Sequence, residues 1–134
     1  MTKTTILWAD DEIDLLKPQV MFLKEKGYEV ITVSNGKDAI AKFSSEKIDV
    51  VLLDESMPGL SGLQTLTLIK ELNQHVPVVM ITKNEEDNLM EEAIGSQIAD
   101  YLIKPVKPQQ ILSALKKILN KTDLVSEKTV SDYR

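Results

Sequence analysis

Between residues 48 and 54 the chain reads Ile48-Asp49-Val50-Val51-Leu52-Leu53-Asp54, an apolar run that ends on a carboxylate. Such a run predicts a strand that is buried on both faces, as in a parallel sheet. A carboxylate at the end of a buried strand raises the free energy of the fold unless another group compensates its charge. Asp54 is therefore the first candidate for a functional side chain.

Apolar runs alternate with helical patterns along the whole of this 134-residue chain. Strands are predicted near 5–9, 28–33, 49–54, 77–82 and 100–103, and helices near 13–26, 36–45, 62–73, 85–94 and 107–120. The alternation predicts an α/β doubly wound domain, with a five-stranded parallel sheet and helices on both of its faces. Among right-handed topologies, the flavodoxin-like (βα)5 arrangement with strand order 2-1-3-4-5 is a common one.

Two local patterns refine the helix predictions. Pro18 falls inside the first helical pattern, which predicts an irregular first turn or a kink and a regular helix from about Lys17 or Pro18. Ser61 and Gln64 have the spacing of a capping box at the start of the third helix.

The length of the chain suits one domain, which we place at residues 1–120. Residues 121–134 are polar and weakly patterned. We expect them to form a C-terminal tail or a linker toward an output domain that is absent from this sequence.

The composition excludes several classes of protein. The chain is 43% hydrophobic and 28% charged, as in ordinary globular proteins, and it has no cysteine for disulfides or thiolate zinc sites. Its net charge of -5 argues against direct binding to nucleic acid, which needs a basic surface. No apolar stretch approaches the ~20 residues that span a bilayer, and the N-terminus lacks a secretory signal pattern. We therefore expect a cytoplasmic protein with no membrane contact.

A second apolar run, Ile6-Leu7-Trp8-Ala9, also ends on acids, Asp10 and Asp11. In the strand order 2-1-3-4-5, the first and third strands are neighbours, and ligands bind beyond their carboxyl ends. Three carboxylates would then meet at one edge of the sheet and repel one another without a cation between them. This arrangement is typical of a metal-assisted phosphoryl acceptor.

Four separated motifs extend the pattern, and their order and spacing are specific. They are Asp10-Asp11-Glu12, Leu53-Asp54-x-x-Met57-Pro58-Gly59, Ile81-Thr82 and Tyr101-Leu102-Ile103-Lys104-Pro105. Over residues 4–120 the chain resembles the bacterial response-regulator receiver family, a CheY-like group of two-component signalling proteins. The resemblance implies a phosphoacceptor domain that takes phosphoryl from a histidine kinase, a phosphotransfer protein or a small phosphodonor. It does not imply an enzyme with an external substrate.

The resemblance also implies a role for each acidic residue of the motifs. Asp54 would be the phosphoacceptor, and Mg²⁺ would be the cofactor. Asp11, Asp54 and the backbone carbonyl of Ser56 would bind the metal directly, and Asp10 would act through water. Mg²⁺ keeps several waters, so few carboxylates suffice to hold it. Considered alone, Asp54 also fits a turn residue and Asp11 a helix cap.

The remaining motif residues have implied roles in the response to phosphorylation. Lys104 would pair with the phosphoryl group, and with one of the carboxylates in the empty site; in the family the bond before Pro105 is cis. Thr82 would be the switch hydroxyl, and Tyr101 the aromatic side chain that turns inward with it. Each has a plainer alternative: a solvated loop lysine, a helix cap, and a half-buried strand aromatic.

The implied interaction surface consists of helix 4, strand 5 and helix 5. After phosphorylation this face would dock to a partner or to a second copy, which gives a phosphorylation-dependent homodimer. An output domain after residue 120 is a further expected partner.

Two other functions compete with this interpretation. A pseudo-receiver would be an interaction module that no longer takes phosphate, and the intact motifs speak against it. A haloacid dehalogenase-type phosphatase needs a second acid two residues after its nucleophile, where this chain has Ser56.

Lys83 departs from the family pattern, because the residue after the switch threonine is commonly small. A long cation there would either crowd the phosphoryl entrance or attract anionic donors. Glu12 is expected only to favour the start of a helix. A finer set of details is similar to PorX-type regulators, which are linked to type IX secretion: Trp8, Leu15-Leu16-Lys17-Pro18, Pro58-Gly59-Leu60-Ser61-Gly62 and Ile81-Thr82-Lys83.

Overall fold

The computed structural model describes residues 3–83 and 97–132, and for residues 121–132 it describes the backbone alone. The helix predicted near 85–94 lies outside the described residues.

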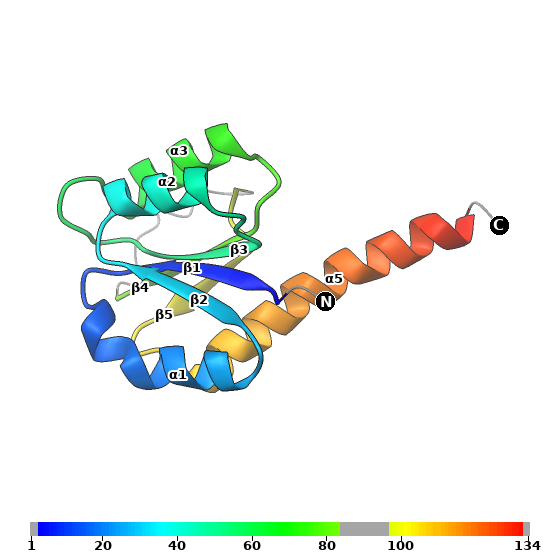
Figure 1. Cartoon of the computed structure of the whole chain (residues 1–134), viewed down its shortest axis with the longest axis horizontal. Helices are drawn as coiled ribbons and strands as arrows, with labels where there is room; N and C mark the ends of the chain where they lie inside the picture. The colour runs from blue at the N-terminus through cyan, green and yellow to red at the C-terminus, as the bar shows by residue number, and fades with distance from the viewer. Residues whose placement is uncertain (1–2, 84–96, 133–134) are drawn as a thin grey trace.

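Five parallel strands form the centre of the domain (Figure 1). They are β1 (Thr5–Ala9), β2 (Glu29–Val33), β3 (Val50–Asp54), β4 (Val78–Thr82) and β5 (Asp100–Ile103). Their order in the sheet is β2-β1-β3-β4-β5, which confirms the predicted flavodoxin-like topology. Strands β3 and β4 are buried along their whole length, as their unbroken apolar runs predicted.

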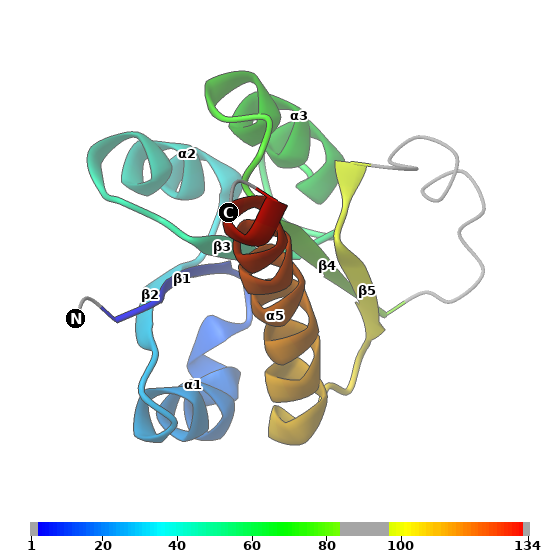
Figure 2. The same ribbon diagram turned by 90° about the vertical axis from the view of Figure 1, so that its right-hand side faces the viewer.

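Helices cover both faces of the sheet. On one face lie α1 (Lys17–Glu25) and α5 (Pro108–Asp132), and on the other lie α2 (Gly36–Ser45) and α3 (Gly62–Leu72) (Figures 1 and 2). Each face has its own apolar core. Leu23 and Ile111 join the core under α1 and α5, whereas Ala39 and Leu66 join the core under α2 and α3. The helices therefore leave only the ends of the strands for a functional site.

The starts of two helices agree with the sequence patterns. A single turn of 3-10 helix, η1 (Ile13–Leu16), precedes α1, which begins at Lys17 with Pro18 in its first turn. Proline is tolerated there because the first N–H groups of a helix have no intrahelical partner. At α3, Ser61 Oγ accepts from Gln64 N–H at 3.1 Å, and Gln64 Oε1 accepts from Ser61 N–H at 2.9 Å.

The last helix is longer than predicted. The sequence indicated an end near residue 120, but α5 continues to Asp132 (Figure 2). No glycine or proline interrupts residues 109–132, and a polar composition does not by itself stop a helix. The division into a domain at 1–120 and a linker stays a prediction, now with a helical backbone for much of the linker. Within the described residues, no helix is both long and apolar enough to cross a membrane.

Candidate functional site

The carboxyl ends of four strands bring the predicted site residues together. Asp10 follows the last residue of β1, Asp54 ends β3, Thr82 ends β4, and Lys104 follows the last residue of β5. In the strand register Ala9 pairs with Leu53, and Thr82 pairs with Ile103. The parallel register therefore places all of these residues at one edge of the sheet.

Backbone hydrogen bonds continue just beyond the strands and fix these ends. Asp10 N–H donates to the carbonyl of Val33 at 3.1 Å, and Lys104 N–H donates to the carbonyl of Thr82 at 2.7 Å. After Asp54, the N–H of Glu55 donates to the carbonyl of Ile81 at 3.2 Å. The backbone of the site residues is therefore held in place by hydrogen bonds of the sheet.

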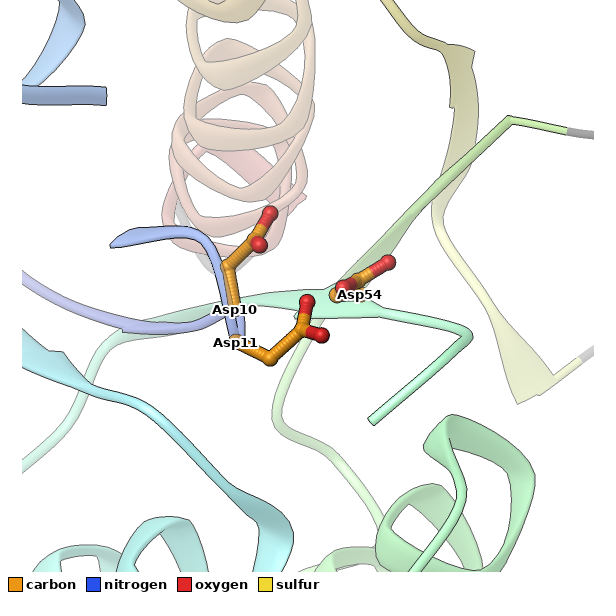
Figure 3. A group of neighbouring side chains, drawn as sticks. All are labelled: Asp10, Asp11 and Asp54. Carbon is orange, nitrogen blue, oxygen red and sulfur yellow. The ribbon is translucent and has the colours of Figure 1, made fainter. Parts of the chain in front are cut away.

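Three carboxylates form the centre of the site (Figure 3). Asp10, Asp11 and Asp54 each offer one oxygen, and these oxygens lie within 4.8 Å of one another. Asp10 and Asp54 are buried and Asp11 is exposed, so the cluster opens to solvent on the Asp11 side. Figure 3 shows the Asp11 side chain turned toward Asp54. The sequence prediction that acids from the first and third strands converge is confirmed.

Lys104 supplies a buried positive charge to this cluster. Its Nζ lies 2.9 Å from Oδ2 of Asp10 and 3.5 Å from Oδ1 of Asp54. Burial opposes the charge of Lys104, but the hydrogen bond and charge of Asp10, together with Asp54, outweigh it and raise the pKa of the ammonium. The expected pairing of this lysine with a carboxylate is confirmed, and the bond between Lys104 and Pro105 is cis.

The electrostatics of Asp54 differ from those of an ordinary carboxyl. Burial and then the charge of Asp10 raise its pKa from 3.8 to about 7, against the opposing effect of Lys104. A side-chain hydrogen bond with Asp11 also raises this pKa, and the N–H of Ser56, 3.4 Å from Oδ1, lowers it. Lys104 therefore compensates the cluster only in part.

The oxygen-only donor set fits a hard divalent cation. Mg²⁺ prefers carboxylate, carbonyl and water oxygens, and it would supply the positive charge that the cluster lacks. Both oxygens of Asp10 already have partners, since Oδ1 accepts from Glu12 N–H at 2.8 Å and Oδ2 pairs with Lys104. This agrees with an indirect role for Asp10, and it leaves Asp11 and Asp54 as the side chains best placed to bind a metal.

Thr82 and Tyr101 lie close to this site in the sheet. Thr82 is buried at the end of β4, and Tyr101 is half-buried on β5, where it packs against the core under α2 and α3. In the register Tyr101 pairs with Met80, two residues before Thr82. The alternative in which Thr82 caps the next helix lies outside the described residues.

Sequence reasoning missed an ion pair at the rim of the site. Nζ of Lys83 lies 2.8 Å from Oε1 of Glu12, whose side chain was expected only to favour the start of a helix. That expectation was incomplete, because the Glu12 side chain makes no capping hydrogen bond. Glu12 directly follows Asp11, and Lys83 directly follows Thr82. These opposite charges beside two site residues were the signal in the sequence that could have predicted the ion pair.

Gly62 also escaped attention. Its N–H donates to the carbonyl of Glu55 at 2.8 Å, and a Cβ at this residue would lie 2.5 Å from the carbonyl oxygen of Asp54. Only a glycine lets the start of α3 approach the end of β3 so closely. The turn at Met57-Pro58-Gly59 leads into this contact, with Met57 buried in the core and Gly59 at a φ of 79°.

Comparisons with known proteins agree with the geometry. The family model described as "Response regulator receiver domain" matches residues 6–116. The phosphate regulon transcriptional regulatory protein PhoB of Pseudomonas aeruginosa is 35% identical over 126 residues, which cover 91% of this chain and 54% of PhoB. The alkaline phosphatase synthesis transcriptional regulatory protein PhoP of Bacillus subtilis is 29% identical over 123 residues, which cover 90% of this chain and 50% of PhoP. The chain thus spans about half the length of these relatives.

Among solved structures, the chain is similar to a response regulator receiver domain protein from Clostridium thermocellum. The two have a TM-score of 0.82 and 31% sequence identity, and the match covers 91% of this chain and 98% of the other. The finer resemblance to PorX-type regulators stays a prediction.

Proposed function

The chain belongs to the response-regulator receiver family, and we propose that Asp54 is the residue on which this receiver domain takes its phosphoryl group. One observation carries the proposal: a buried carboxylate at the end of β3 shares its site with two further carboxylates and with the ammonium of Lys104. No observation favours the pseudo-receiver alternative.

The donor would be the phosphohistidine of a histidine kinase or phosphotransfer protein, or a small acyl phosphate. Asp54 attacks as the carboxylate, and a new bond forms between one of its oxygens and phosphorus. The bond between phosphorus and the donor nitrogen or oxygen breaks, and its electron pair stays on the donor. Oδ1 of Asp54 faces Lys104 and the N–H of Ser56, and the carboxyl also shares a side-chain hydrogen bond with Asp11.

Mg²⁺ would be held by Asp11, Asp54 and the backbone carbonyl of Ser56, with Asp10 acting through water. When bound, the metal neutralises the carboxylates and polarises the phosphoryl oxygens. Lys104 then turns from carboxylate to phosphoryl oxygen, since its ammonium already lies between Asp10 and Asp54. The domain in this way assists its own phosphorylation and dephosphorylation without an external substrate.

Phosphorylation would favour an active conformation that already exists in the unmodified protein. Thr82 donates its hydroxyl to a phosphoryl oxygen, and Tyr101 turns further into the core beside it. The interaction face would comprise β5, α5 and the segment between β4 and β5, because Thr82, Tyr101 and Lys104 border it. Its partner is an output domain after residue 120 or a second copy of the domain. The greater length of the regulators PhoB and PhoP supports an output domain.

Intact-mass analysis after treatment with acetyl phosphate, with and without Mg²⁺, tests the acceptor. We expect the mass of one phosphoryl group to appear only with Mg²⁺, and to be absent in Asp54→Asn. The exposed Asp14 in η1 supplies the matched control, since Asp14→Asn should be labelled like the wild type. An unlabelled wild-type protein would favour the pseudo-receiver instead.

The switch is tested separately by amide NMR spectra with Mg²⁺ and beryllium fluoride, which imitates the phosphoryl group. We expect shifts at the amides of β5 and of the first turns of α5, and few shifts at the start of α2 on the other side of the sheet. Spectra that stay unchanged at saturation would contradict the proposed interaction face.

A further inference from the structure

An ion pair spans the end of the strand that carries Asp54. Lys83 follows Thr82 after β4, and Glu12 follows Asp11 after β1, and β3 lies between these two strands in the sheet. The Lys83 ammonium lies 2.8 Å from the Glu12 carboxylate, although their side chains are 69% and 41% exposed. Exposed ion pairs of this kind contribute little to stability. The position of the pair therefore suggests a role in recognition.

The charge of Lys83 acts on the acidic cluster. The hydrogen bond and charge of Glu12 raise the pKa of Lys83 most; burial lowers it, and the carboxylates of Asp11 and Asp54 raise it by smaller amounts. Lys83 follows β4, the neighbour of the strand that ends at Asp54, so its charge lies at the same end of the sheet as the acidic cluster. The positive potentials of Lys83 and Lys104 add at this end of the sheet. Lys83 is thus a second cation, after Lys104, at the end of the sheet where a phosphoryl group would bind.

A pocket of about 420 Å³ connects this pair to the other lysine of the site. Its charged lining residues are Lys83, Lys104 and Glu12. Lys83 pairs with Glu12, and Lys104 pairs with Asp10, which does not line the pocket. The rest of its lining is apolar or neutral, from Leu15, Leu16, Gln19, Pro105 and Val106. Lys104 connects the pocket to the acidic cluster, since its Nζ lies 3.5 Å from Oδ1 of Asp54. The apolar walls suit the uncharged part of a phosphodonor, and the Lys83 ammonium would become available to an anion once Glu12 releases it.

We propose that Lys83 is a specificity-determining residue for the phosphodonor, and that Glu12 controls its availability. The Lys83 ammonium attracts the anionic phosphoryl group into the pocket and directs it to Asp54, while Glu12 competes for the same ammonium. Lys83 changes no bond: the oxygen of Asp54 bonds to phosphorus, the donor leaves with its electron pair, and Lys83 keeps its protons. This inference rests on the proposed function of Asp54.

The experiment measures the initial rate of labelling by acetyl phosphate at saturating Mg²⁺ and at several salt concentrations. We expect Lys83→Met to lower the rate at low salt by about threefold to tenfold and to flatten its dependence on salt, because electrostatic attraction is screened by ions. Glu12→Gln should raise the rate by about twofold to fivefold, since it frees the ammonium. The double variant should behave like Lys83→Met. Lys47→Met, at the opposite edge of the sheet, is the control and should match the wild type.

The outcomes separate this inference from the proposed function. A wild type that is labelled on Asp54, with a Lys83→Met variant of unchanged rate and salt dependence, overturns the role of Lys83 alone. Equal slowing by Lys83→Met and Glu12→Gln would also overturn it, because that result indicates a structural bridge between two loops. A wild type that takes no phosphoryl group overturns both proposals together.

Discussion

The ammonium nitrogen of Lys104 lies closer to Oδ2 of Asp10, at 2.9 Å, than to Oδ1 of Asp54, at 3.5 Å. In the metal-free fold the lysine therefore compensates Asp10 first. Asp54 keeps an unfavourable negative charge, which its raised pKa expresses. Lys104 thus lies farther from the residue proposed to take phosphorus than from Asp10, and the predictions on Lys104, pH and Mg²⁺ follow from that imbalance.

Replacing Lys104 by an uncharged residue should leave the repulsion among the carboxylates of Asp10, Asp11 and Asp54 uncompensated. We expect Lys104→Met to lower the free energy of unfolding of the metal-free protein by about 3 kcal/mol, the usual cost of removing one partner of a buried pair. The same variant should bind Mg²⁺ more tightly, because a competing positive charge is gone. Denaturant unfolding and a Mg²⁺ titration measure the two effects. Lys107→Met, at an exposed neighbouring lysine, should change neither quantity.

The raised pKa of Asp54 predicts a dependence of stability on pH. Between its ordinary value of 3.8 and about 7, the folded protein holds a proton that the unfolded chain has lost. The contribution of Asp54 to stability therefore falls as pH rises through this window and is constant above it. Unfolding curves from pH 4 to pH 8 without metal, compared between the wild type and Asp54→Asn, isolate the effect. A difference between the two proteins that does not vary with pH would contradict the assignment.

The same titration should govern metal affinity. Because Mg²⁺ binds the carboxylate and not the acid, its affinity should rise with pH up to about 7 and then level off. Asp54→Asn should bind Mg²⁺ weakly and lose most of this pH dependence. Trp8 is the only tryptophan of the chain and is fully buried two residues before Asp10, so its fluorescence provides a convenient readout.

Mg²⁺ should stabilise the folded domain. A ligand that binds only the folded state adds about 2.7 kcal/mol at a hundred times its Kd, and millimolar Mg²⁺ should therefore raise Tm by several degrees. Because Asp11 is exposed, Asp11→Asn should change the metal-free Tm little and abolish the increase. A flat Tm across millimolar Mg²⁺ at constant ionic strength would argue against the metal site.

Gly62 should be needed to keep the end of β3, and with it Asp54, in its present position. A methyl group at Gly62 would meet the carbonyl oxygen of Asp54 at 2.5 Å and Cα of Glu55 at 2.6 Å, so Gly62→Ala must displace that backbone. We expect a loss of about 2 kcal/mol in stability, as for other overpacked sites, and weaker Mg²⁺ binding. Gly36→Ala is the matched control, because its methyl group would clash with Thr65 and Leu60, between α2 and the approach to α3. That variant should lose stability and keep its metal affinity.

Much of the site was predictable because its residues lie at the ends of strands. Parallel strands carry their carboxyl ends to one edge of the sheet, so the sequence positions of Asp10 and Asp54 predicted their meeting. The place of Lys104 beside them was implied only by the resemblance to receiver domains. Pro18 predicted the irregular start of α1, and Ser61 with Gln64 predicted the capping box, because both effects act within one helical turn. The predicted end of the last helix near residue 120 was wrong, because the polar segment that follows contains no glycine or proline that would stop α5.

By itself, the sequence determined the order of the strands' apolar runs and the acids that close them, because burial and backbone geometry act over a few neighbouring residues. Only the tertiary structure decided which carboxylate Lys104 favours, that Glu12 and Lys83 meet across the end of β3, and that α3 approaches Asp54 through Gly62. The two lysine contacts join segments that are far apart in the chain, and the Gly62 contact depends on how the loop after β3 folds back. Their distances depend on strand register and loop conformation, which no local pattern of residues encodes.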